Sequence, residues 1–169
     1  KLPSKDELNA LKSAIKDNSK VPAGINTLIK SFPKDAHPMG ITAAAMVALS
    51  GHYPNLIDQD LSDAQKQEIF PLMLGQLKTI AACVYRHGQG QDFIESDSSL
   101  DYTADFLYMM TGEKPNQDVA NSLDVLLILH ADHEQNCSAS TVRVVGSSKA
   151  NLFASISSGI DALWGPVHV

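Results

Sequence analysis

The chain has 169 residues, 44% of them hydrophobic, which is enough for one domain with a real core. Its net charge of −6 and isoelectric point near 5.4 argue against a nucleic-acid binder, which would need a basic face. No apolar run reaches about 18 residues, so no membrane span is predicted, and the first residues lack the apolar core of a signal peptide. Cys83 and Cys137 have no metal-ligand spacing and are expected to be reduced thiols.

Apolar residues recur at spacings of three and four along most of the chain, which is the pattern of amphipathic helices. Two capping boxes, Ser4 to Glu7 and Ser62 to Gln65, mark helix starts. Pro71 lies inside the longest predicted helix and predicts a kink or break there. In chain order, we predict helices over about residues 4–17, 22–33, 39–51, 62–85, 98–110, 117–134, 138–145 and 151–163.

No segment shows the alternation typical of a half-buried strand, and the strand-like residues 141–145 are flanked by helical patterns. The predicted fold class is therefore all-α, a multi-helix packed domain. His37 precedes a proline at a predicted helix start, which favours a capping or packing role. We expect His52 and His87 in surface or turn positions.

The most informative stretch is the run Leu126-Leu-Ile-Leu-His130-Ala-Asp-His133-Glu134-Gln-Asn136. It places two imidazoles and two carboxylates within five residues, at the end of an apolar segment. On a helix, His130, His133 and Glu134 would share one face. Burial of the preceding leucines would then hold them in a partly buried place where pKa values shift and chemistry can occur. By spacing alone, the two histidines fit either a substrate-binding pair or helix-terminal residues that bond backbone carbonyls.

A metal site is the other interpretation of this run. His130, His133 and Glu134 are ligand types for zinc at helical spacing. However, the chain lacks the His-Glu-x-x-His pattern of zinc proteases, and the position of Cys137 fits no common site. We therefore expect no metal.

The run resembles the histidine-rich signature of the citrate synthase family, in its bacterial and plant-peroxisomal branch. A second match covers residues 146–151, 158–160 and 163–168, and the spacing from His133 to His168 is the one that this branch uses. Weaker similarities lie upstream, at residues 1–4, 35–39, 79–82 and 105–110. Because the resemblance covers nearly the whole chain in one register, it implies that residues 1–169 form part of the large helical domain of a citrate synthase-like fold.

The resemblance also implies a reaction, the condensation of acetyl-CoA with oxaloacetate to citrate and CoA through an enol. It implies that the enzyme needs no cofactor and that its small-molecule partners are these two substrates. The catalytic residue would be His168, a neutral imidazole that donates a hydrogen bond to the thioester carbonyl. His133 would bind oxaloacetate, with His130 as a supporting substrate-binding residue. Three further side chains would support the histidines: Asp132, Glu134 and Asn136.

Parts of the family's machinery have no match in the chain. Only two arginines occur, Arg86 and Arg143, no Gly-His-x-x-Tyr motif is present, no aspartate follows His168, and Val169 stands where the family has glycine. We therefore expect a piece of a longer enzyme, without its N-terminal β-rich segment and C-terminal half, that is active only as the full-length protein. Helices that pack on the missing part, or on a second copy in a homodimer or higher homo-oligomer, should be exposed.

Alternatives remain open at this point. A 2-methylcitrate synthase would use propionyl-CoA on the same scaffold, and a truncated paralogue would bind or regulate without catalysis. A helical interaction domain with incidental histidines is the option outside the family. For the compartment, the cytoplasm is the first expectation, with a mitochondrial or peroxisomal matrix as the alternative.

Overall fold

The computed structural model describes residues 2–58, 60–131 and 134–167. All regular structure in these ranges is helical, which confirms the all-α prediction. None of the helices described is long and apolar enough to cross a membrane. The α-helices are α1 (Lys5–Asp17), α2 (Ala23–Ser31), α3 (Pro38–Leu49), α4 (Asp63–Gly88), α5 (Tyr102–Thr111), α6 (Gln117–His130), α7 (Cys137–Ser147) and α8 (Leu152–Leu163), and two 3₁₀ turns, η1 (Ser50–His52) and η2 (Pro54–Leu56), follow α3.

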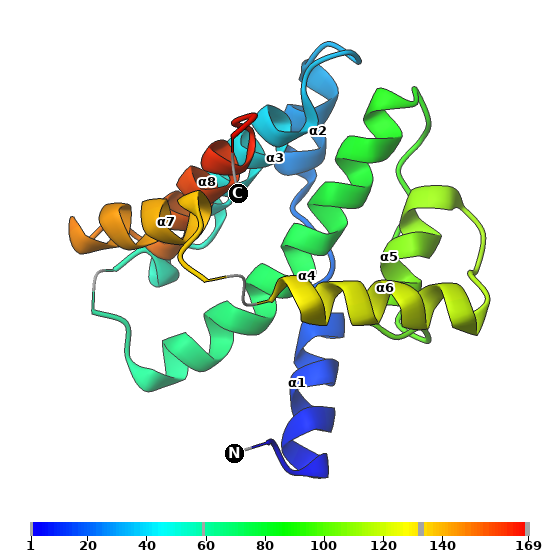
Figure 1. Ribbon diagram of the computed structural model, residues 1–169, viewed down its shortest axis with the longest axis horizontal. Helices are drawn as coiled ribbons and strands as arrows, with labels where there is room; N and C mark the ends of the chain where they lie inside the picture. The colour runs from blue at the N-terminus through cyan, green and yellow to red at the C-terminus, as the bar shows by residue number, and fades with distance from the viewer. Residues whose placement is uncertain (1, 59, 132–133, 168–169) are drawn as a thin grey trace.

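Helix α4 runs through the middle of the molecule (Figure 1). Helices α1, α2, α3 and α5 contact it, α8 packs on α3, α7 packs on α8, and α6 packs on α5. The main core lies between α2, α3, α4 and α8. Its largest fully buried apolar side chains are Phe153, Ile25, Ile29, Met46, Leu49, Leu56, Ile69 and Ile80.

Side chains at the helix ends explain where several helices begin. Both predicted capping boxes are present: each serine accepts from the backbone N–H three residues on, and Glu7 or Gln65 accepts in return from the backbone of the cap. Helix α4 continues through Pro71 without a break. The strand-like residues 141–145 lie inside α7, as their helical flanks predicted.

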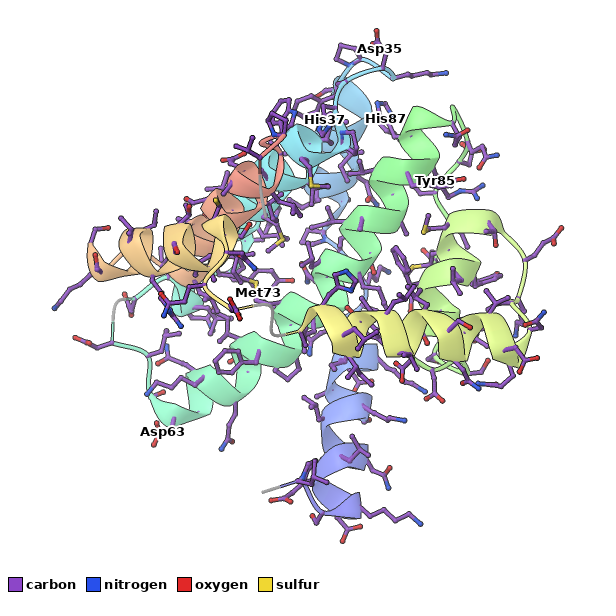
Figure 2. All side chains as sticks on the ribbon, viewed as in Figure 1. Asp35, His37, Asp63, Met73, Tyr85 and His87 are labelled. Carbon is purple, nitrogen blue, oxygen red and sulfur yellow. The ribbon has the colours of Figure 1, made fainter. Side chains whose placement is uncertain are left out.

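The histidines near the chain's middle differ in their burial. His37 caps α3, because its Nδ1 accepts from the backbone N–H of Met39 at 3.2 Å. His52 is exposed in η1, as expected. The prediction for His87 is wrong: it is buried at the end of α4, where Nε2 lies 2.9 Å from the backbone oxygen of Phe32. The labels in Figure 2 place His37 and His87 toward the same end of the molecule.

Helix α6 ends earlier than predicted. It stops at His130, whose Nδ1 lies 2.7 Å from the backbone oxygen of Leu126, one turn earlier in the same helix. Glu134 has a φ of 60°, in the left-handed region, and cannot continue the helix. Asn136 already caps α7. The predicted shared helical face of His130 and Glu134 therefore does not exist.

The leucines before the histidine run are also not buried in this chain. Leu126, Leu127 and Leu129 are between 45% and 62% exposed, and Ile128 is 67% exposed. Periodicity shows that a helix carries an apolar face but does not show which surface covers it. Among the described helices, α6 packs on α5 and buries Ala120, whereas the apolar side chains near its C-terminal end stay exposed.

Candidate functional site

The hairpin of α7 and α8 brings the two predicted motif segments to the same end of the hairpin, on the side that faces the middle of the molecule (Figure 1). Ser138 Oγ at the start of α7 donates to the backbone oxygen of Gly159 at 2.7 Å. The helices approach closely there, since a Cβ on Gly159 would lie 2.7 Å from Val142 Cγ2. The chain enters α7 from the histidine run and leaves α8 toward the Gly-Pro segment, so both runs start from this same end.

Two of the predicted residues in the histidine run make local hydrogen bonds with the helix backbone. The imidazole of His130 bonds its own helix, which is the alternative that spacing had left open beside substrate binding. Asn136 is the N-cap of α7, because its Oδ1 accepts from the backbone N–H of Ala139 at 2.9 Å. Glu134 is exposed on the connection between the helices.

The remaining predicted site residues, Asp132, His133 and His168, lie outside the described residues. Their roles stay predictions. What the structure does give is the frame on both sides of them: the end of α6, the cap of α7 and the turn that follows α8.

That turn begins at Trp164, the C-cap of α8. The indole stacks on the His37 ring with centroids 4.8 Å apart and an angle of 10° between the planes. It also covers Gly40, where an added Cβ would lie 2.9 Å from the indole Cζ3. The residues that precede the predicted catalytic histidine are thus held against the first turn of α3.

A buried ion pair was missed by the sequence analysis. Lys78 on α4 and Asp105 on α5 form a direct ion pair with side chains 2% and 3% exposed. The carboxylate also accepts from Ser96 Oγ at 2.6 Å and from the backbone N–H of Asp97 at 2.8 Å. Burial raises the pKa of the neighbouring Tyr102 phenol. The pair fixes the loop before α5 to the central helix, and no sequence pattern distinguishes it from surface charges on amphipathic helices.

A cavity of 420 Å³ lies between the end of α1, α2, α4 and the 92–98 loop, away from the predicted motif residues. Cys83 lines it, and the thiol donates toward Asn26 Oδ1 at 4.0 Å. Burial raises the pKa of this thiol to about 11, against the smaller opposing effect of the Lys30 and Arg86 charges. The cysteines described are both free, and Cys137 is exposed.

Of the two arginines, one bonds backbone carbonyls and the other is exposed, and the described acidic side chains do not form a metal site. Arg86 donates to the backbone oxygens of Asp92 and Met110, the latter at 3.0 Å, so it joins α4 to the loop and to α5 rather than facing a ligand. Arg143 is exposed on α7. In the part of the chain that the structure describes, no three His, Cys, Asp or Glu side chains gather as metal ligands would.

Comparison with known families gives a match over the whole chain. The model of "Citrate synthase, C-terminal domain" matches residues 1–169. Citrate synthase 1 of Mycobacterium tuberculosis, in strains CDC 1551 / Oshkosh and ATCC 25618 / H37Rv, is 42% identical over 172 residues, which cover 99% of this chain. The chain spans 40% of the length of these curated relatives.

Solved structures show the same similarity. Citrate synthase from Pyrobaculum aerophilum is 29% identical with a TM-score of 0.89, over 100% of this chain and 44% of that one. Citrate synthase from Thermoplasma acidophilum, in a ternary complex with carboxymethyl coenzyme A and oxaloacetate, has a TM-score of 0.92 at 24% identity, over 99% and 43% of the two chains. At that identity the second comparison shows a shared fold only.

Proposed function

The chain belongs to the citrate synthase family, a family of acyltransferase enzymes, and from this membership we propose that the complete protein makes citrate. In the proposed reaction, acetyl-CoA loses a methyl proton to form an enol, whose carbon attacks the ketone of oxaloacetate. Hydrolysis of the resulting citryl-CoA releases citrate and CoA. The observation that carries the proposal is the 42% identity to citrate synthase 1 along 99% of the chain.

We propose two residues of this chain as direct contributors. His168 donates a hydrogen bond to the thioester carbonyl oxygen, where negative charge develops as the enol forms. A neutral imidazole suits this role, and a site closed to water would favour that neutral form. His133 donates a hydrogen bond to oxaloacetate. His130, whose Nδ1 bonds the backbone oxygen of Leu126, is proposed as the supporting substrate-binding residue alongside His133.

The proposal concerns the whole protein, with residues 1–169 as part of its large helical domain. The exposed apolar side chains of α6 support this assignment, because such a face in water favours packing against further protein. We propose that the rest of the protein and a second copy in a homo-oligomer cover it. The cytoplasm is the proposed compartment, in line with the bacterial relatives named above.

The test is an assay of the purified full-length protein with acetyl-CoA and oxaloacetate, following CoA release with a thiol reagent and citrate by mass spectrometry. We expect citrate only when both substrates are present. Replacing His168 with Asn should lower kcat by about 100- to 1,000-fold, the usual effect of removing one donor to a developing oxyanion. The conservative His52→Asn variant, at an exposed position in η1 outside the motif residues, is the matched control and should change kcat by less than about threefold.

A parallel assay with propionyl-CoA separates the two acyl substrates. A higher kcat/KM for propionyl-CoA would favour 2-methylcitrate synthesis instead. No CoA release with either thioester, from a folded protein, would contradict the enzymatic proposal and leave the non-catalytic paralogue.

A further inference from the structure

The contact between His37 and Trp164 joins segments that are far apart in the sequence. The two rings lie nearly parallel, 10° apart, with centroids at 4.8 Å, which is within the range of favourable offset stacking. The close approach of the indole to Gly40 adds a second contact with the same turn of α3. Trp164 makes these contacts although it is 49% exposed, so hydrophobic burial alone does not explain its position.

Helices α3 and α8 run antiparallel and are fixed to each other at a second point. Ser157 Oγ donates to the backbone oxygen of Ala43 at 2.8 Å, in a buried position. At 1.5 Å per residue, this bond and the ring stack lie about 10 Å apart along both helices. Two separate contacts set the register of the pair, so the C-terminal end of α8 has a defined place relative to the start of α3.

Two backbone features restrain residues 165 and 166. The backbone N–H of Gly165 donates to Ala162 at 3.2 Å, and Pro166 has a fixed φ. Val167 is 79% exposed, so its side chain gives the turn little anchorage. In the described part of this segment, the indole is the side chain that ties the turn to another helix, and His168 follows four residues after it.

We propose that His37 and Trp164 are positioning residues, which hold the Gly165–Val167 turn and thereby aim His168 at the thioester carbonyl. This inference rests on the proposed function and adds to it a part of α3 that no motif marks. A hydrogen bond to a developing enolate depends on placement, and a displacement of about 1 Å can lower a rate by about 100-fold. The stack acts through His168 and touches no substrate.

His37 has two roles that substitutions can separate. Its Nδ1 caps α3 through the Met39 N–H, and its ring stacks on the indole. His37→Asn retains a capping acceptor and removes the ring, whereas His37→Phe retains a ring and removes the acceptor. Trp164→Ala and Trp164→Phe form a second pair, in which only Phe retains an aromatic surface.

The experiment measures kcat, both KM values and the thermal midpoint of the full-length protein for these four variants. We expect Trp164→Ala and His37→Asn to lower kcat by about 10- to 100-fold, with the KM for oxaloacetate changed by less than about threefold. Trp164→Phe and His37→Phe should stay within about threefold of the parent kcat, although His37→Phe should lower the thermal midpoint through the lost cap. In a His168→Asn background, Trp164→Ala should have no further effect on kcat.

A merely structural stack would give a different pattern. In that case kcat would follow the thermal midpoint, with His37→Phe worse than His37→Asn, and the positioning role would be overturned. An unchanged kcat in Trp164→Ala would overturn it as well. If the parent protein makes no citrate, the proposed function and this inference fall together. If the parent is active and sensitive to His168→Asn, the function stands independently of the four variants.

Discussion

At the scale of single side chains, Lys78 and Asp105 form an ion pair in the described interior of the protein. Both groups are almost fully withdrawn from water, and the carboxylate has two further donors in Ser96 and the Asp97 backbone. A buried charge without its partner keeps its full desolvation penalty. We therefore expect Asp105→Ala to destabilise the protein by about 3–5 kcal/mol.

The measurement is the thermal unfolding of full-length variants by circular dichroism. Lys66→Ala is the control, because it removes an exposed ion pair with Asp63 at 3.2 Å, and such pairs contribute at most about 1 kcal/mol. The double replacement Lys78→Met with Asp105→Leu should recover much of the loss, since it leaves no unpaired charge. Equal midpoints for Asp105→Ala and Lys66→Ala would contradict the assigned role.

From the raised pKa of the Cys83 thiol, we predict that the protein loses stability at high pH. Its folded pKa is about 11, above the ordinary value of 9.0, so the folded state holds the proton more tightly than the unfolded chain does. The contribution of the protonated thiol to the free energy of unfolding is complete below pH 9 and declines as the pH rises toward 11. For a pKa difference of two units, the loss is at most about 3 kcal/mol. We expect the difference in thermal midpoint between the parent and Cys83→Ala to be constant from pH 7 to about 8.5 and then to narrow steadily. A constant difference up to about pH 10.5 would contradict this assignment.

At the scale of the helices, two glycines differ in the space that an added side chain would find. At Gly75 on α4, an added Cβ would lie 2.7 Å from the backbone oxygen of Ile15 and 2.9 Å from the backbone of Asn18. At Gly146 on α7, the nearest atom to an added Cβ is Ser155 Oγ at 3.9 Å. Backbone atoms cannot rotate away as side chains can. An added methyl group therefore has no room at Gly75 but fits at Gly146.

We expect Gly75→Ala to destabilise by about 1–3 kcal/mol, because α1 must move away from α4 to make room. Gly146→Ala should instead stabilise by about 0.4–1 kcal/mol, because alanine restricts the unfolded chain and favours a helix. Thermal midpoints of the two variants should shift in opposite directions. A stabilising Gly75→Ala would show that α1 packs on α4 less closely than described.

The helices themselves could largely be predicted from the sequence, because their signals are local. Capping serines, the glycine after α5 and the asparagines before α7 and α8 act through hydrogen bonds and dihedral angles within a few residues. The end of α6 could not be predicted, because no glycine or proline marks it, and Glu134 is a residue type that rarely adopts the left-handed conformation it has here. Burial of His87 and of the Lys78 pair depends on partners 55 and 27 residues away, which no local pattern shows.

The candidate site was predicted only as a set of residues near two motifs. Helices α7 and α8 pack antiparallel, and this packing brings the two motifs to the same end of the pair. The spacing of apolar residues in the sequence does not predict how two helices pack. The stack of His37 on Trp164 connects α3 to this end and was not foreseen, although a capping or packing role for His37 was. The hydrophobic pattern of a helix thus predicts which of its side chains must be buried. Which other element buries them follows only from the tertiary structure.

At the scale of the whole chain, α6 presents an apolar face that the other described helices leave exposed. Val125, Leu126, Ile128 and Leu129 of α6 are all at least half exposed. Large apolar patches on a protein in water favour association. We therefore expect the isolated chain to form soluble oligomers or aggregates in light scattering and to bind a hydrophobic dye, more strongly per mole than the full-length protein.

The control for this association is Ile128→Lys in the isolated chain. It places a charge on the exposed face and should reduce both dye binding and the scattered mass. A parent chain that is monomeric and binds no dye would contradict the idea that α6 needs a covering surface.

The chain alone should not synthesise citrate, even when it is folded. Of its two arginines, Arg86 already bonds two backbone carbonyls, and a dicarboxylate is best held by paired guanidinium donors. Catalytic groups that act as a unit lose most of their effect when one is missing, so His133 and His168 without a base for the acetyl methyl group should give no useful rate. We expect CoA release from acetyl-CoA and oxaloacetate at the buffer background for the 169-residue chain, measured beside the full-length protein as a positive control. Turnover that His168→Asn abolishes would mean that these residues contain a complete site, and the base would then have to be sought among the chain's own carboxylates.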